Sequence, residues 1–161
     1  MAPWEPGLVV ELAQLYEKHN RVDEAIARYD AWLKKNPRTQ LAANNLAMLL
    51  ITYRTDRASL DRASELTRGF DSSTEAAFLD TDGWVHFKRA EYADALPPLQ
   101  RAVERAPESH LIHYHLGMAE LQAGRTDRAR AELQTAVSGA AQFQGLEEAR
   151  TALASLNSRT S

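Results

Sequence analysis

The chain contains no cysteine among its 161 residues. This absence excludes disulfides, thiol nucleophiles and metal sites built on thiolates. No stretch approaches the roughly 18 consecutive apolar residues that a membrane-spanning helix requires. The beginning, MAPWEPGLVV, lacks the basic segment followed by an apolar segment that marks a signal peptide. Membrane insertion is therefore not expected, and the compartment stays open between cytoplasm and periplasm.

A strong charge of one sign is also missing. The formal net charge is −3 and there is no basic block, which is not the electrostatic pattern of a nucleic-acid-binding protein. The motifs HExxH, GxxxxGK[ST], GxGxxG and GxSxG do not occur, and no Ser–His–acid signature is recognisable. We therefore predict neither an enzyme nor a cofactor. A composition of 44% hydrophobic and 25% charged residues is that of a folded globular chain.

What the chain does contain is an internal repeat. Four segments align with one another, and each has two positions that hold small residues, recurring about every 34 residues. Small residues let two helix backbones approach closely, so each segment is expected to be a pair of helices that cross there. The small residues are Ala13, Ala47, Gly83 and Gly117 at the first position and Ala25, Ala63, Ala95 and Ala129 at the second.

This repeat resembles the tetratricopeptide repeat, a helix–turn–helix unit with small residues where its two helices cross. The resemblance covers about residues 6 to 140. It implies an all-α, right-handed α-solenoid that forms a single domain over residues 1–161, with repeats at about 6–39, 40–75, 76–109 and 110–140. The stretches NNLA and DTDGWV are similar to the C-terminal repeats of long bacterial tetratricopeptide proteins.

Apolar periodicity predicts where the helices lie. The last helix is expected to cap the array, because one face is apolar and the opposite face is polar. Its apolar stripe consists of Leu146, Ala149, Leu153 and Leu156. The helices are predicted at about residues 7–19, 22–35, 40–53, 57–69, 75–89, 92–106, 110–123, 127–138 and 144–157.

Turns and caps follow from the same register. Asn20 and Gly124 fall at turns between paired helices, where residues that tolerate a positive φ are suitable. Thr39 and Ser109 are expected to cap the helices that follow them.

Two local departures carry predictions of their own. The segment TYRTDRA contains extra residues between the small positions of the second repeat, which predicts a longer loop. Pro97 and Pro98 lie beyond the first turn of their helix, where proline removes a backbone donor and crowds the preceding turn. A kink or a late helix start is expected there.

In the tetratricopeptide family the first helices of successive repeats line a concave groove, where partner peptides commonly bind. The resemblance therefore implies a protein–protein interaction scaffold. Asn45, in LAANNLA, matches an Asn that holds ligand backbones in peptide-binding relatives, but the Lys and Arg neighbours of a carboxylate clamp are missing. The groove residues implied are Val10, Gln14, Lys18, Asn44, Asn45, Met48, Asp80, Trp84, Lys88, Tyr114, Met118 and Gln122.

Other interpretations of the same residues stay open. Trp84 could instead pack against a neighbouring helix. The chain could be a self-assembling module, because no polar helix precedes the first repeat to cover its face, so association through the N-terminal end is predicted.

A third alternative is a metal-dependent activity at Asp82, His86 and Glu120, which occupy slots that are mostly apolar in the other repeats. The structural interpretation of this trio is an ion pair or a satisfied polar contact. His113 and His115 point about 200° apart on a helix, so they cannot share one ion.

Overall fold

The computed structural model describes residues 6–139 and 142–158. These ranges contain helices and no strand, which confirms the predicted all-α helical-repeat class of α-solenoids. None of the described helices is long and apolar enough to cross a membrane. The helices are α1 (Pro6–Lys18), α2 (Val22–Lys35), α3 (Gln40–Tyr53), α4 (Arg57–Leu66), the 3₁₀ helix η1 (Phe70–Ser72), α5 (Ala76–Lys88), α6 (Tyr92–Arg105), α7 (His110–Gln122), α8 (Thr126–Ala136) and α9 (Leu146–Ser158).

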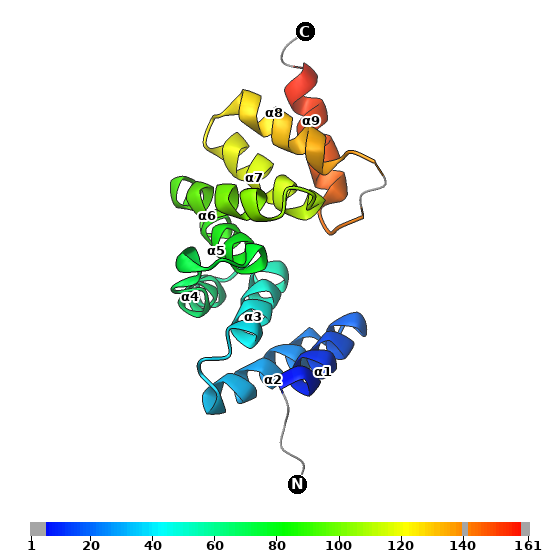
Figure 1. Cartoon of the computed structure of the whole chain (residues 1–161). Coiled ribbons are helices and arrows are strands. Elements are labelled where there is room, and N and C mark those ends of the chain that lie inside the picture. The colour runs from blue at the N-terminus through cyan, green and yellow to red at the C-terminus, as the bar shows by residue number, and fades with distance from the viewer. Residues whose placement is uncertain (1–5, 140–141, 159–161) are drawn as a thin grey trace. The chain divides into compact units, whose positions relative to one another are not determined.

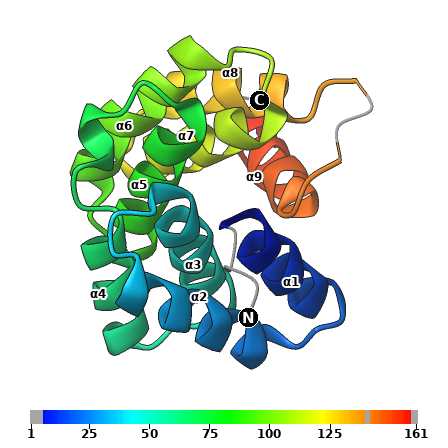
Figure 2. The same ribbon diagram turned by 60° about the horizontal axis from the view of Figure 1, so that its bottom comes forward.

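The chain divides into two compact units, with the boundary between Arg68 and Gly69. In unit 1, α1 packs against α2, α2 against α3, and α3 against α4. In unit 2, α5 to α8 pack in the same consecutive way, and α9 lies against both α7 and α8 (Figure 1 and Figure 2). Each repeat is therefore a helix pair, as predicted. The single right-handed domain over residues 1–161 stays a prediction.

The helices of each pair cross at the small residues. Ala25, Ala63, Ala95 and Ala129 are fully buried. A Cβ atom added to Gly83 would lie 2.5 Å from Cγ of Leu99, and one added to Gly117 would lie 2.8 Å from Cγ of Leu133. Both leucines are fully buried, so each fills the space that its glycine leaves open.

The turns within three of the pairs share one backbone geometry. Asn20 and Gly124 adopt positive φ angles of 58° and 76°, which confirms the prediction, and Ala90 has a φ of 62° at the equivalent turn. In each turn the backbone amide of the following residue donates a hydrogen bond to a carbonyl oxygen in the last turn of the preceding helix. These bonds run from Arg21 to Tyr16, from Glu91 to His86 and from Arg125 to Glu120. The bond from Glu91 to His86 holds Ala90 in the left-handed conformation, which costs alanine about 1–2 kcal/mol.

Of the two predicted caps, one is confirmed and one is wrong. Ser109 accepts a hydrogen bond from the backbone amide of Ile112. The side chain of Thr39 makes no cap hydrogen bond. Its hydroxyl instead accepts a hydrogen bond from the indole nitrogen of Trp32 in α2 at 3.1 Å. The oxygen that would have capped α3 is therefore bonded to a side chain of another helix.

The two local departures also differ from expectation. The linker between α3 and α4 is residues 54–56, no longer than the linkers 19–21, 89–91 and 123–125, so the predicted longer loop is wrong. Most of the extra residues of TYRTDRA lengthen the start of α4. Ala63 therefore lies in the second turn of α4, whereas the small residues of the other second helices lie in the first turn. Of the two alternatives predicted for Pro97 and Pro98, the late helix start is wrong, because α6 begins at Tyr92 and runs through both prolines, and the kink stays a prediction.

Candidate binding surfaces of the first helices

The structure gives the predicted groove residues three kinds of environment. Gln14, Lys18, Lys88 and Gln122 are exposed. Val10, Asn45 and Met48 are half-buried. Asn44, Asp80, Trp84, Tyr114 and Met118 are buried. Their binding role stays a prediction in every case, but the buried members would act on a ligand only through the side chains that cover them.

In unit 1 the predicted asparagines form a chain of amide hydrogen bonds. Asn45 donates to the hydroxyl of Tyr29 at 3.1 Å, and Asn44 donates to the side-chain oxygen of Asn45 at 3.2 Å. Burial raises the pKa of Tyr29 above its ordinary value. The side-chain oxygen of Asn44 is buried and has no hydrogen-bond partner among the described residues. An acceptor in this situation costs about 1–3 kcal/mol unless something donates to it.

In unit 2 the predicted aromatic anchor, Trp84, is buried between helices. Trp84 is only 5% exposed. Its ring stacks on Phe87 at 4.3 Å and on His115 at 4.0 Å between centroids. The ammonium of Lys88 lies 4.8 Å from the centre of the Trp84 ring, within the range of a cation–π contact. The alternative that Trp84 packs against a neighbouring helix is therefore what the structure shows.

A buried hydrogen bond joins the first helices of the last two repeats. Nδ1 of His115 on α7 lies 2.7 Å from a carboxylate oxygen of Asp80 on α5, and both side chains are under one-tenth exposed. Sequence reasoning missed this pair. The available signal was that His115 falls beside Leu116 and Gly117 on the buried side of its helix. His113 turns instead to Glu132 on α8, so the two imidazoles bond to different helices, as helical geometry predicts.

The last helix is attached through a second buried aromatic residue. The hydroxyl of Tyr114 donates to Glu148 of α9 at 2.7 Å. Burial raises the pKa of Tyr114 far above its ordinary value, and the Glu148 carboxylate raises the pKa further. Gly145 has a φ of 104°, and a Cβ there would lie 2.6 Å from the Tyr114 ring, so the chain enters α9 directly against this ring.

The polar trio does not come together as a metal site. No group of three His, Cys, Asp or Glu residues in the described ranges could hold a metal ion. Nδ1 of His86 lies 2.8 Å from Glu91, and burial would raise the pKa of Glu91, but hydrogen bonds from His86 and Arg89 lower it below its ordinary value. Glu120 accepts a hydrogen bond from Gln100 at 3.3 Å.

These features define an all-α protein of paired, consecutively packed helices whose polar networks tie one repeat to the next. A family model described as tetratricopeptide repeat matches residues 10–52 and 82–145. The chain belongs to the tetratricopeptide repeat family. Members of this family are in general non-catalytic scaffolds for protein interactions.

Solved structures agree with this assignment at the level of the fold. TTC0263, a thermophilic tetratricopeptide protein of Thermus thermophilus, has a TM-score of 0.74 and 21% identity, covering 97% of this chain and 83% of its own. MamA has a TM-score of 0.69 and 20% identity, covering 92% and 84%. YrrB, described as having an unusual peptide-binding site, has a TM-score of 0.64 and 20% identity, covering 95% and 76%. None of the curated proteins compared with this chain matches it.

Proposed function

We propose that the protein is a non-catalytic scaffold that binds a peptide or protein surface along the first helices of its repeats. One observation carries this proposal above the others, the side-chain amide of Asn45 on half-exposed surface, which is oriented by its hydrogen bonds to Tyr29 and Asn44. Each of these bonds uses one of the two donor and two acceptor positions of the amide, so a second N–H and a second lone pair remain. The backbone groups of a ligand in extended conformation would satisfy both. The peptide-binding site reported for YrrB, a structural neighbour, supports the same use of this fold.

In unit 2 the proposed contacts are made by side chains above the buried aromatic wall. Lys88 lies over Trp84 and is exposed, so its ammonium is held in place and open to a ligand. Gln122 is exposed at the end of α7. Asp80, Trp84, Tyr114 and Met118 then act as support that positions these groups, and Gln14, Lys18 and Met48 extend the surface in unit 1.

A panel of variants tests this proposal. Peptides would be selected from a random library displayed on phage, and the dissociation constant of the tightest peptide would be measured by calorimetry. If the peptide lies on the first helices of unit 1, Asn45→Ala should weaken its binding about tenfold, the effect of losing one strong polar contact. If it lies on the first helices of unit 2, Lys88→Ala should have the same effect.

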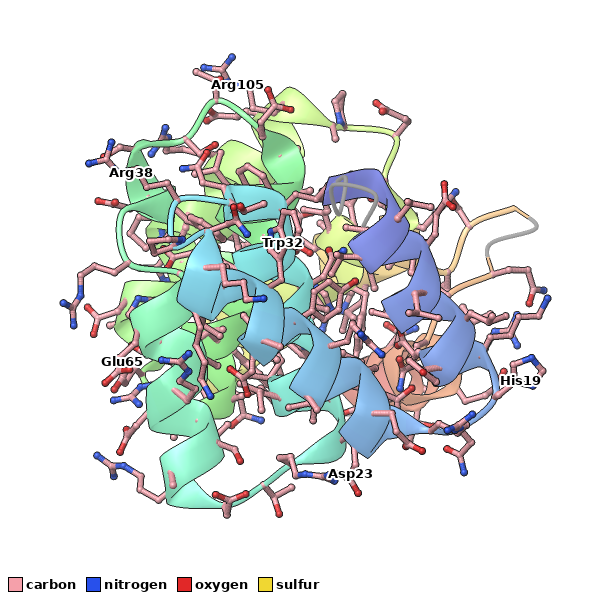
Figure 3. The ribbon with its side chains drawn as sticks, turned by 90° about the horizontal axis from the view of Figure 1, so that it is seen from below. His19, Asp23, Trp32, Arg38, Glu65 and Arg105 are labelled. Carbon is pink, nitrogen blue, oxygen red and sulfur yellow. The ribbon has the colours of Figure 1, made fainter. Side chains whose placement is uncertain are left out.

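The matched control is Arg105→Ala. Arg105 is exposed at the end of α6, and its side chain points outward in Figure 3. Arg101 is unsuitable because it hydrogen-bonds the backbone oxygens of Asp71 and Ser73. A peptide that binds the Asn45 and Lys88 variants as tightly as the wild type would contradict the proposal.

Self-association is a second candidate function, favoured by one observation on unit 1. Leu8 and Leu15 lie two turns apart on α1 and are 56% and 50% exposed. Exposed apolar stripes of this kind mark interaction surfaces. We expect the mass measured by sedimentation to rise with protein concentration, and the double variant Leu8→Glu, Leu15→Glu to remain monomeric. A wild type that stays monomeric at every concentration would rule this function out.

A further inference from the structure

A hollow in unit 2 borders the predicted first-helix surface at Gln122. It has a volume of about 610 Å³ and is formed by the N-terminal half of α6 and the turn between α7 and α8. Of the residues proposed above as ligand contacts, Gln122 alone also borders it among the described residues. Its lining is Ala90, Glu91, Tyr92, Ala93, Asp94, Leu96, Pro97, Gln100, Gln122, Ala123 and Arg125.

Two backbone oxygens in this lining lack their helical donors. Pro97 and Pro98 lie inside α6 and have no N–H group. In an α-helix the amide four residues later donates to each carbonyl, so the carbonyls of Ala93 and Asp94 receive no such bond. Ala93 and Asp94 are both exposed and both line the hollow. Two helical hydrogen bonds of α6 are therefore missing, and the carbonyl oxygens of Ala93 and Asp94 are left without these donors.

The carboxylate of Asp94 adds to these acceptors. Asp94 is exposed on the wall of the hollow. Behind the wall, Glu120 is 2% exposed, and one of its carboxylate oxygens has no hydrogen-bond partner in the described chain. Gln100, which lines the hollow, donates to the other oxygen at 3.3 Å. The one cationic residue among the described lining residues, Arg125, lies 3.5 Å from the Glu120 oxygen that lacks a hydrogen-bond donor, and Arg128 lies 3.9 Å from the other oxygen. The charge of Glu120 is therefore balanced, and the Asp94 carboxylate stays the acceptor that a ligand can reach.

The remaining wall is apolar. Tyr92 is half-buried and packs against Phe87, while Leu96 is buried and Pro97 is exposed beside it. A hollow with an apolar wall and a cluster of acceptors matches a side chain with a hydrocarbon stem and a charged head that only donates. Arginine fits better than lysine, because its planar guanidinium carries five N–H donors for several acceptors at once.

We propose that this hollow is a binding site for an arginine side chain of a partner protein. The guanidinium contacts the carbonyls of Ala93 and Asp94 and the Asp94 carboxylate, and the stem lies on Tyr92 and Pro97. Of the contacts proposed for the first-helix surface, this site shares Gln122 alone. It depends on Pro97 and Pro98, because at these positions other residues would supply amide donors.

A nuclear magnetic resonance titration with two small peptides tests the proposal. The probe is acetyl-Gly-Arg-Gly-amide, and its control is the same peptide with citrulline, which has the shape of arginine without its charge. For a single side chain we expect a dissociation constant on the order of millimolar. The arginine peptide should shift the amide signals of Ala90 to Leu96, Gln100 and Gln122 to Arg125, and the citrulline peptide should bind at least about fivefold more weakly. Equal binding of the two peptides, or shifts spread evenly over acidic residues of the surface, would overturn the proposal.

Two variants separate a binding role from a structural one. Asp94→Asn removes the charge and should weaken binding of the arginine peptide several-fold. Glu104 is an exposed acidic residue on the same helix outside the hollow, so Glu104→Gln should leave binding unchanged. Pro97→Ala restores a donor to the Ala93 carbonyl, so it should raise the melting temperature and weaken binding together. A Pro97→Ala protein that binds the arginine peptide as tightly as the wild type would refute the role of the open carbonyl. The Asn45 and Lys88 variants should leave this titration unchanged, so failure here and failure of the first-helix proposal are distinguishable.

Discussion

Replacing Trp84 with alanine is expected to lower the free energy of unfolding by about 3–5 kcal/mol, the usual cost of truncating a buried aromatic side chain. Trp84 is 5% exposed, and its ring is stacked on both Phe87 and His115. The change would leave a cavity between α5 and α7 and would remove the contact that covers the Asp80–His115 pair. Urea denaturation followed by far-ultraviolet circular dichroism measures the loss.

Trp32→Ala is the matched control for this experiment. Trp32 is half-buried and lines an open hollow with Val9 and Ala31 in unit 1, and its indole nitrogen donates a hydrogen bond to Thr39. Its replacement should cost roughly half as much, because less apolar area returns to water. A Trp84→Ala protein as stable as the wild type would contradict the buried stacking and would restore Trp84 as a solvent-facing anchor for a ligand.

Replacing Gly83 with alanine is expected to destabilise the protein by about 2–3 kcal/mol, although alanine is normally the better helix residue. The added Cβ would lie 2.5 Å from Cγ of Leu99 and 3.0 Å from the backbone oxygen of Ala95. Leu99 and Ala95 are fully buried, so neither can move aside without separating α5 from α6. Thermal unfolding monitored by circular dichroism measures the effect.

Gly7→Ala supplies the control for Gly83. Gly7 is also helical, in α1, and a Cβ added there meets no atom within 4 Å among the described residues. This change should be neutral or should stabilise α1 by up to about 1 kcal/mol, because alanine loses less backbone entropy in a helix. If Gly83→Ala were as harmless as Gly7→Ala, the two helices would not cross at Gly83 and the register of the repeat would be wrong.

The sequence by itself determined the repeat, the helices and the positions where they cross. Spacing carries this information because a helix pair of constant size must place its small residues at a constant interval. The predicted boundaries of α2 and α3 match the structure, and Ala25 and Ala95 are buried as the register requires. Turns were predictable where a residue with a local preference was present, as at Asn20 and Gly124.

Only the tertiary structure decided what each first helix exposes. Periodicity assigns Asp80 and Trp84 to one face of α5, but His115, a repeat further along the chain, covers both. In the same way the hydroxyl of Thr39, which was expected to cap α3, instead accepts a hydrogen bond from Trp32. A local pattern records the intrinsic preference of a segment, whereas burial depends on side chains that come from distant parts of the chain. The sequence therefore placed the candidate residues on the correct helices. Whether such a residue faces solvent or lies buried beneath other side chains depends on how the neighbouring repeat packs against it.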